Sequence, residues 1–223
     1  MNGLLYLAIG SPNSSILEIL GQAFDEGNPD SAYFLLPKEL GSTDYPFSYW
    51  SWNGNTFEFQ ISDDRMPKEW FLLFSNNIDL ADQIEGVVGL LEKEKKLSIG
   101  RILLFINSQV LFERGDLLEW MNGCAHFADA ICYTNRNNEN GKKVAECVDK
   151  YKSFHYPLEN FILKKNKPVP LSQILSTTTR RISHIFDPPD LLEENESVQS
   201  DPFLERNSMG KRIRPIPLPF SNH

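Results

Sequence analysis

Cysteine and histidine are scarce in this chain, whose 223 residues include three cysteines and four histidines. Cys124, Cys132 and Cys147 are odd in number and lack the paired spacing of a zinc site, which argues against a disulfide framework or a structural metal centre. Two of them lie in apolar stretches, so we expect reduced, mostly buried thiols of a cytoplasmic protein. Cys124 and His126 lie two apart on an expected helix and point away from each other, so we expect no metal site.

Positive charge and long apolar runs are also in short supply. Lysine and arginine number 22 against 30 aspartates and glutamates, which gives a formal net charge of -8 at pH 7. Because so acidic a chain repels phosphate-coated surfaces, we expect neither nucleic acid nor a membrane as a partner. The N-terminal "MNGLLYLAIG" lacks a basic leader and a run long enough to span a bilayer, which again indicates the cytoplasm.

The chain does contain enough apolar residues, 41% of the total, to bury one full core. Short apolar runs of strand length alternate with segments that carry apolar residues on one helical stripe. This alternation predicts an α/β domain with a mostly parallel, doubly wound sheet. The expected strands are 4–10, 32–37, 70–74, 101–107, 129–135 and 160–165, and the helical stripes lie within 80–91, 117–125 and 144–151.

One segment, "YPFSYWSWNGNTFEFQI" at 45–61, departs from this alternation. Two aromatic-rich runs flank Asn53-Gly54, and both residues tolerate the positive φ of a two-residue turn, so we expect an antiparallel hairpin insertion or sheet edge. The hairpin has more aromatic surface than one face can hide. Trp50 and Trp52 are therefore candidates for a site that binds a protein partner, with ordinary packing on the sheet edge as the alternative.

The composition changes after about residue 175, so we predict a domain at 1–175 and a tail at 176–223. The tail is first acidic and then basic and proline-rich, which favours a flexible, largely disordered segment. Its opposite charge blocks, 187–196 and 211–214, leave open that it folds back on the body or docks on a partner. The candidate anchors for such a partner are Phe203, Arg212 and Arg214.

The turn after the first strand, "GSPNSSIL" at 10–17, has the greatest functional interest. In an open parallel sheet, the first strand-to-helix turn is the usual phosphate site. The same residues also read as plain capping chemistry, with Ser11 as the N-cap and Pro12 at the first helical position. Taken alone, the stretch favours the capping interpretation.

Without gaps, however, this stretch resembles "GSGKTTLL", the phosphate loop of the CobW, HypB and UreG class of P-loop GTPases. Pro12 and Asn13 stand where that class has a glycine and the lysine that neutralises the β and γ phosphates. The residues kept in kind are Gly10, Ser11, Ser14 and Ser15.

Two later segments resemble the same class in the same order. "LFSNNIDLADQI" at 73–84 is similar to "ETSGLADP", with Asn76 at the acidic position. "LLFINSQ" at 103–109 is similar to the strand that ends in "VDA", with Asn107 in place of the aspartate. In both segments a neutral amide replaces a carboxylate.

"HFADAICYTNRNN" at 126–138 resembles "ADRIVLNKTD", the strand and guanine-reading motif of that class. Ungapped, Asn137 takes the aspartate position. Slid by one residue, Asn135 and Arg136 match the Asn-Lys pair and Asn138 takes that position. The carboxylate is absent in either alignment. The resemblance spans about 3–175 and implies a three-layer P-loop NTPase-like fold.

The replaced groups imply a pseudo-GTPase. Phosphoryl transfer depends on compensating charge, and Pro12 has no N–H to donate to a phosphate, so we expect negligible hydrolysis and no catalytic residue. We expect no cofactor. The exception would be GTP with magnesium, if the degenerate pocket still binds them. That pocket would consist of Gly10, Ser11, Asn13, Ser14, Ser15, Asn76, Asn107, Asn135, Asn137 and Asn138.

The metal chemistry of the class does not transfer to this sequence. CobW-type proteins carry a cysteine cluster between the second and third strands, whereas 38–69 here contains no cysteine or histidine. Three functions remain open: a non-catalytic interaction or regulatory module with an unknown protein partner, a weak or altered-specificity nucleotide binder, and an enzyme of unknown type. Because HypB and UreG relatives dimerise, the resemblance also implies a homodimer.

Overall fold

The structure is a computed structural model that describes residues 1, 3–25, 32–61, 67–112, 117–164, 167–187 and 201–221. Most of the acidic block predicted at 187–196 lies outside these residues. The described residues include parts of all the expected strands and of all the expected helices.

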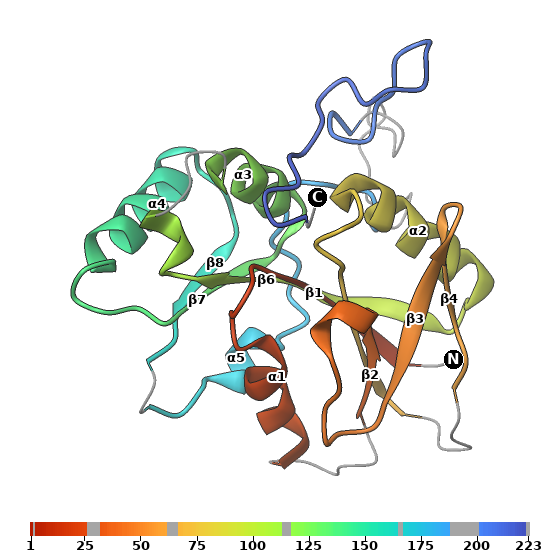
Figure 1. The fold of residues 1–223 in the computed structure, drawn as a ribbon, viewed down its shortest axis with the longest axis horizontal. Helices are drawn as coiled ribbons and strands as arrows, with labels where there is room; N and C mark the ends of the chain where they lie inside the picture. The colour runs from red at the N-terminus through yellow and green to blue at the C-terminus, as the bar shows by residue number, and fades with distance from the viewer. Residues whose placement is uncertain are drawn as a thin grey trace.

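The core is an eight-stranded sheet in the order β4-β3-β2-β5-β1-β6-β7-β8 (Figure 1). Neighbouring strands are parallel except for β3 and β4, which are antiparallel. This mostly parallel sheet confirms the predicted fold class. The strands are β1 Gly3–Gly10, β2 Ala32–Leu36, β3 Phe47–Asn53, β4 Thr56–Phe59, β5 Glu69–Leu73, β6 Leu97–Asn107, β7 Ala130–Thr134 and β8 Glu159–Ile162.

Helices cover both faces of the sheet, which makes three layers (Figure 1). One apolar cluster joins the sheet to α2, α3 and α4 through Ile84, Met121 and Val144. A second cluster lies on the opposite face and includes Ile19 of α1 and Ile174 of α5. The helices are α1 Ile16–Asp25, α2 Leu80–Lys93, α3 Leu117–Phe127, α4 Gly141–Ser153 and α5 Leu171–Ile174, with short 3-10 helices η2 Lys38–Leu40 and η3 Val110–Phe112.

Strand β1 lies at the point where the strand order reverses. It pairs with β5 on one side and with β6 on the other. The chain runs outward through β2 to β4 on the first side and through β7 to β8 on the second. Because crossovers leave in opposite directions here, the carboxyl end of β1 is the usual ligand crevice of such a sheet.

The aromatic hairpin forms as predicted, but its turn is shifted by one residue. Asn53 pairs with Thr56, so the turn consists of Gly54 and Asn55 rather than Asn53 and Gly54. Gly54 has a φ of 67°, the left-handed angle that glycine adopts without strain. Strand β3 also pairs in parallel with β2, so the hairpin extends the main sheet.

The two hairpin tryptophans pack against the body, Trp50 buried and Trp52 half-buried. Trp50 is buried, and its Nε1–H donates to the Leu73 carbonyl at 3.0 Å. Trp52 contacts α2 so closely that a Cβ on Gly86 would lie 2.7 Å from its ring. These residues therefore follow the alternative of ordinary packing on the sheet edge. The prediction that Trp50 contributes to a partner-binding site is corrected, because its ring is buried.

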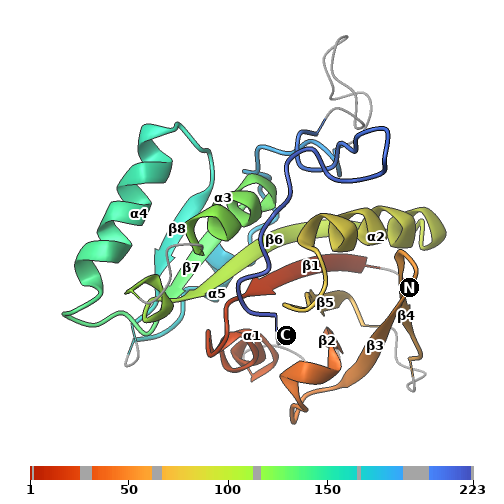
Figure 2. The ribbon, with the colours of Figure 1, turned by 45° about the horizontal axis from the view of Figure 1, so that its top comes forward.

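The described parts of the tail lie on the body, next to α2 and α3 (Figure 2). They contain no helix or strand, but Phe203, Leu204 and Ile216 are buried in the same apolar cluster as α2 and α3. For 176–187 and 201–221, the structure differs from the prediction of a largely disordered tail. The basic block folds back on the body because acidic residues of α2 pair with it.

The remaining predictions concern thiols, metals and membranes. The three cysteines are free and buried, as expected for core thiols. Within the described ranges, no three histidine, cysteine, aspartate or glutamate side chains gather where they could hold a metal ion. Over the same ranges, none of the helices has the length and apolar character needed to cross a bilayer.

Candidate functional site

The first turn joins the end of β1 to α1 at the carboxyl edge of the sheet. The helix begins only at Ile16, and its first backbone hydrogen bond runs from Ile19 to the Ser15 carbonyl at 3.0 Å. Ser11 is therefore not the N-cap and Pro12 is not the first helical residue. The capping interpretation is wrong because the residues between the strand and the helix form an extended loop.

Ser11 instead fixes the loop to β6. Its backbone N–H donates to the Phe105 carbonyl at 2.9 Å, and its Oγ accepts the backbone N–H of Asn107 at 2.8 Å. Both bonds are made by buried groups. The loop is thus tied to the strand beside it before it turns toward the helix.

The loop itself contains two residues with left-handed backbone angles, Asn13 at a φ of 58° and Ser15 at 55°. Each such residue costs on the order of 1 kcal/mol and persists only where its surroundings hold it. Gly10 is the point of close approach, because a Cβ there would lie 2.9 Å from the buried Ser14 hydroxyl. One glycine therefore meets the steric need of this turn.

Three asparagines hold the carbonyl oxygens of the loop, and we call them the turn asparagines. They lie at or just after the carboxyl ends of β5, β6 and β7, and each donates a side-chain N–H. The pairs are Asn76 with the Gly10 carbonyl at 3.0 Å, Asn107 with the Pro12 carbonyl at 3.4 Å, and Asn135 with the Asn13 carbonyl at 3.1 Å. A carboxylate has no N–H and could not replace any of them.

Two of the turn asparagines also bind each other. Asn135 Nδ2 donates to Asn107 Oδ1 at 3.2 Å, and the same oxygen accepts the backbone N–H of Gln109. The network joins the ends of β6 and β7 to the first turn. All three turn asparagines contact the first turn, but they do not line one common pocket: Asn76 lines a pocket with the loop residues, Asn135 lines another, and Asn107 lines neither of these two.

Asn137 and Asn138 do not join this network. The Asn137 Oδ1 accepts the backbone N–H groups of Glu139 and Asn140, both at 2.9 Å, so its acceptor is used in the turn before α4. Asn138 is exposed and makes no side-chain hydrogen bond within the described residues. Sequence reasoning missed Asn140, which is buried and donates to the Asn135 carbonyl at 3.0 Å. The asparagine-rich run was the only signal for it.

A pocket of about 300 Å³, the first-turn pocket, adjoins the loop. It is lined by the loop residues together with Leu40, Leu73, Phe74 and Asn76. Among the described residues that line it, Glu18 is the only one with an ionisable side chain. The pocket thus offers no cation to a phosphate.

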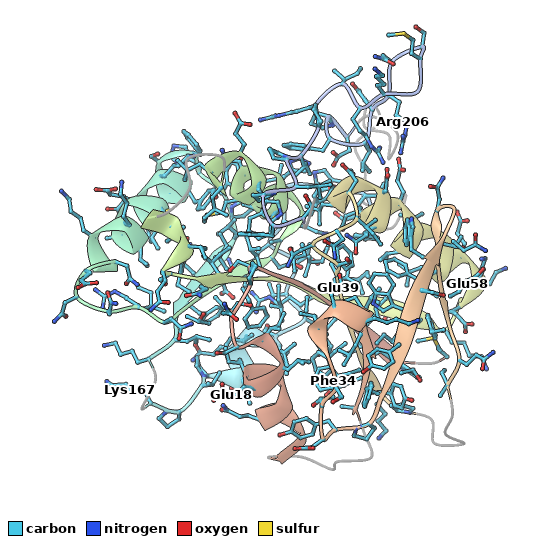
Figure 3. All side chains as sticks on the ribbon, viewed as in Figure 1. Glu18, Phe34, Glu39, Glu58, Lys167 and Arg206 are labelled. Carbon is cyan, nitrogen blue, oxygen red and sulfur yellow. The ribbon has the colours of Figure 1, made fainter. Side chains whose placement is uncertain are left out.

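A second pocket, of about 270 Å³, lies on the β7 side of the loop and is called the lysine pocket here. It shares Ser15 and Glu18 with the first-turn pocket and adds Asn135, Lys164 and Lys167. Figure 3 labels Glu18 and Lys167 at this edge of the molecule. The two lysines therefore line a different pocket from most of the loop residues, although Ser15 belongs to both pockets.

The loop after β5 is fixed by Gln83, a residue that sequence reasoning missed. Its Oε1 accepts the Ser75 N–H at 2.8 Å, and its Nε2 donates to the Ser75 and Ile78 carbonyls, both at 2.9 Å. The Ser75 hydroxyl donates to Glu39 of η2, which Figure 3 labels. This places a second carboxylate near the same edge of the sheet.

The tail candidates for partner binding are mostly engaged within the chain. Phe203 is buried, with its ring centroid 4.9 Å from that of His126. Arg212 pairs with Asp82 of α2 and is largely buried. Arg214 is exposed along its chain, but its guanidinium lies 4.3 Å from the Phe203 ring centroid. The tail anchors therefore hold the tail to its own body.

No family model and no curated protein matches this sequence. Two solved structures share its fold at low identity. The crystal structure of Zn(II)-bound YjiA GTPase from E. coli aligns with a TM-score of 0.50 at 8% identity, covering 79% of this chain and 62% of that one. A Zn(II)-bound triple mutant of YjiA GTPase aligns with a TM-score of 0.53 at 10% identity and the same coverage.

The chain therefore shares the fold of the YjiA GTPase structures, in agreement with the P-loop NTPase-like fold that the sequence predicts. The likeness at this level of identity concerns the fold alone. The chain spans about 62% of the length of the YjiA structures that it matches.

Proposed function

We propose that this chain is a pseudo-GTPase, a GTPase-like domain that does not hydrolyse GTP and serves as an interaction or regulatory module. The observation that carries the proposal is the first-turn pocket, where the only ionisable side chain among the described lining residues is the acidic Glu18. A triphosphate brings several negative charges, and its transfer is catalysed by positive groups that offset them. A carboxylate at this place opposes such binding.

The residues of the first turn do not fit GTP with magnesium. Asn13 takes the position of the phosphate-binding lysine and carries no charge. Pro12 has no N–H to donate. Ser14, at the position of the magnesium-binding hydroxyl, is 3% exposed and lies directly beneath Gly10. These residues therefore supply no catalytic step that involves a bound nucleotide.

The guanine-reading position does not fit the base in either alignment, because Asn137 and Asn138 each offer one amide oxygen where a carboxylate would offer two. The side-chain oxygen of Asn137 accepts two backbone N–H groups of its own turn. A guanine base is read by a carboxylate that accepts two hydrogen bonds, and an oxygen already used in this way cannot do so. The polar groups of the site instead stabilise the loop, which supports a role as a fixed scaffold.

The test is a GTP hydrolysis assay of the full chain with magnesium, run beside a thermal-shift screen with GTP, ATP and their diphosphates. We expect phosphate release at the rate of the protein-free blank, and no rise in the melting temperature at millimolar nucleotide. Hydrolysis by the wild-type chain that disappears in Ser14→Ala would refute the proposal.

A second candidate, a weak nucleotide binder with altered specificity, is favoured by the lysine pocket. Lys164 and Lys167 supply positive charge there, and the backbone N–H groups of Ser14 and Ser15 have no acceptor among the described residues. A thermal shift with nucleotide but without hydrolysis would support this candidate. The shift should then fall in Lys164→Ala and Lys167→Ala and stay unchanged in Asn138→Ala, because Asn138 lines neither pocket.

A further inference from the structure

The residues Glu205–Ile213 of the tail form a tight turn, called the tail hairpin here. Its two arms meet at a bridge between Arg206 and Arg212, and Ile213 N–H donates to the Glu205 carbonyl at 3.0 Å. Asn207 closes the tip, because its Oδ1 accepts two backbone N–H groups, both at 3.0 Å. A polar segment without such bonds would stay flexible in water, so this hairpin is built to hold one shape.

Two arginines fasten the tail hairpin to α2. Arg212 donates to Asp82 at 2.5 Å and to Glu85 at 2.6 Å, and Arg206 reaches the same two carboxylates at 2.7 and 3.0 Å. Burial alone would raise the pKa of Glu85, but the hydrogen bonds from both arginines outweigh it and lower that pKa. Figure 3 labels Arg206 where the hairpin stands out from the body. The hairpin is therefore held by its own hydrogen bonds and by ion pairs to α2, and it projects from the body.

The tail hairpin presents the two most exposed large apolar side chains in the described part of the protein. Met209 at its tip is 76% exposed, and Ile213 is 61% exposed. Exposed apolar side chains on a backbone held by hydrogen bonds are typical of binding anchors, because little backbone entropy is lost when they are buried. Methionine suits such a position since its flexible side chain adapts to the shape of a cavity.

A hollow of about 480 Å³ lies beside the tail hairpin on the same surface. Its apolar lining consists of Val88, Ile185, Leu204 and Ile213. Its rim contains Glu205, Arg206 and Glu85. Glu85 of the rim pairs with Arg206 and with Arg212. Glu205 is therefore the rim carboxylate that has no ion pair among the described residues.

Among the described residues, the tail hairpin carries one unpaired positive and one unpaired negative side chain, so two copies of this surface have complementary charges. Lys211 stands two residues after Met209 and, like Glu205, has no ion pair within the described ranges. One surface therefore carries an apolar knob next to a free positive charge, and an apolar hollow next to a free negative charge. In a twofold arrangement of two copies, each knob would face the hollow of the other copy and each free charge would face one of opposite sign, as isologous interfaces require.

We propose that two copies of this chain associate through the tail hairpin, with Met209 of each copy in the hollow of the other and Lys211 paired with Glu205 of the second copy. The association goes beyond the pseudo-GTPase function and does not depend on nucleotide. The hydrolysis and thermal-shift results therefore do not test the dimer. Likewise, the oligomeric state does not test the pseudo-GTPase function.

The test is sedimentation equilibrium of the full chain from about 1 to 200 μM, a range that detects dissociation constants near micromolar. We expect a concentration-dependent dimer. Met209→Asp should weaken it by about 100-fold, because a charge enters the apolar hollow. Leu118→Asp is the matched control: Leu118 is also an exposed apolar residue, on α3, and its replacement should leave the dimer unchanged.

Charge reversal tests the orientation of the two copies. Lys211→Glu alone and Glu205→Lys alone should each weaken the dimer by about 10-fold, since each places like charges together. The double variant should return to within about threefold of the wild type, because the pair is restored with its signs exchanged. Monomers throughout the concentration range, a dimer indifferent to Met209→Asp, or a double variant without recovery would each overturn the proposal.

Discussion

The side-chain Nδ2–H of Asn76 donates a 3.0 Å hydrogen bond to the backbone carbonyl of Gly10, joining the loop after β5 to the end of β1. In the GTPase class that the sequence resembles, an acidic residue stands at the position of Asn76. A carboxylate there would face the Gly10 oxygen with lone pairs and no proton. The neutral residue at this position is thus explained by what it binds, a carbonyl of the first turn.

Replacing Asn76 by aspartate should destabilise the fold. The Asn76→Asp variant loses one partly buried hydrogen bond and sets a carboxylate against a carbonyl, which costs about 1 to 3 kcal/mol. Urea denaturation followed by circular dichroism measures this change in the free energy of unfolding. Asn138→Asp is the control, because Asn138 is exposed and makes no side-chain hydrogen bond in the described structure. Equal stabilities of the two variants would contradict the role of Asn76.

A glycine in α3 allows the C-terminal segment to lie against that helix. A Cβ at Gly123 would lie 2.7 Å from Cγ1 of Ile216, so Gly123→Ala should force the segment away. We expect the free energy of unfolding in urea to fall by about 1 to 3 kcal/mol, as for other overpacked sites. The double variant Gly123→Ala, Ile216→Ala should regain part of this stability, since the smaller side chain makes room for the methyl group.

Gly89 of α2 provides the comparison for that experiment. A Cβ there meets nothing within 4 Å, so Gly89→Ala should stabilise the protein by up to about 1 kcal/mol through helix propensity. If Gly123→Ala behaved in the same way, the close packing of Ile216 on α3 would be refuted.

The two arginines of the tail hairpin should differ in their importance. The Arg212 side chain is 7% exposed and that of Arg206 is 39% exposed, although both reach Asp82 and Glu85. Arg212→Ala leaves two carboxylates without their buried partner and should raise hydrogen exchange across 201–213 strongly. Arg206→Ala removes a solvent-screened contact worth at most about 1 kcal/mol. The reverse order of effects would show that α2 does not hold the tail through Arg212.

The tail should also loosen in acid because of Asp201. Burial would raise the pKa of Asp201, but hydrogen bonds from His126 Nε2 at 2.8 Å and Ser183 Oγ at 2.6 Å outweigh it, so the pKa lies below its usual 3.8. A carboxyl whose pKa is lowered on folding stabilises the protein above its unfolded pKa. That stability is lost as the pH falls from about 4 through the folded value.

The measurement is the free energy of unfolding of wild type and Asp201→Asn between about pH 6 and pH 2, because the linkage slope reports the protons taken up. The wild type should be the more stable at pH 6, and the difference should shrink toward pH 2. A constant difference across this range would show that Asp201 does not titrate with folding.

The local pattern of apolar residues was sufficient to predict most strands of the sheet and three of its helices. The apolar runs that became β1, β2, β5, β6 and β7 were recognisable because strands buried on both faces need nearly continuous apolar residues. The stripes that became α2, α3 and α4 were recognisable because helical periodicity depends only on residues a few positions apart. The resemblance to P-loop GTPases then predicted the three-layer fold.

The partners of polar side chains could not be predicted in this way. The sequence placed Asn76, Asn107 and Asn135 in one pocket, but not their bonds to the loop carbonyls. It also placed Asn137 there, although the side chain of Asn137 serves its own turn. An amide side chain can reach several acceptors, and the one it binds depends on how distant loops come together. The residues next to it in the sequence do not determine that arrangement.

By itself, the sequence determined the order of strands and helices, the parallel sheet and the absence of a basic residue from 10–17, because each follows from the identity and spacing of neighbouring residues. Only the tertiary structure decided that α1 begins at Ile16, that Trp50 is buried, and that the tail folds back on α2 and α3. Those features depend on contacts between residues far apart in the chain. Such contacts form only where packing, and the pairing of buried polar and charged groups, bring the segments together.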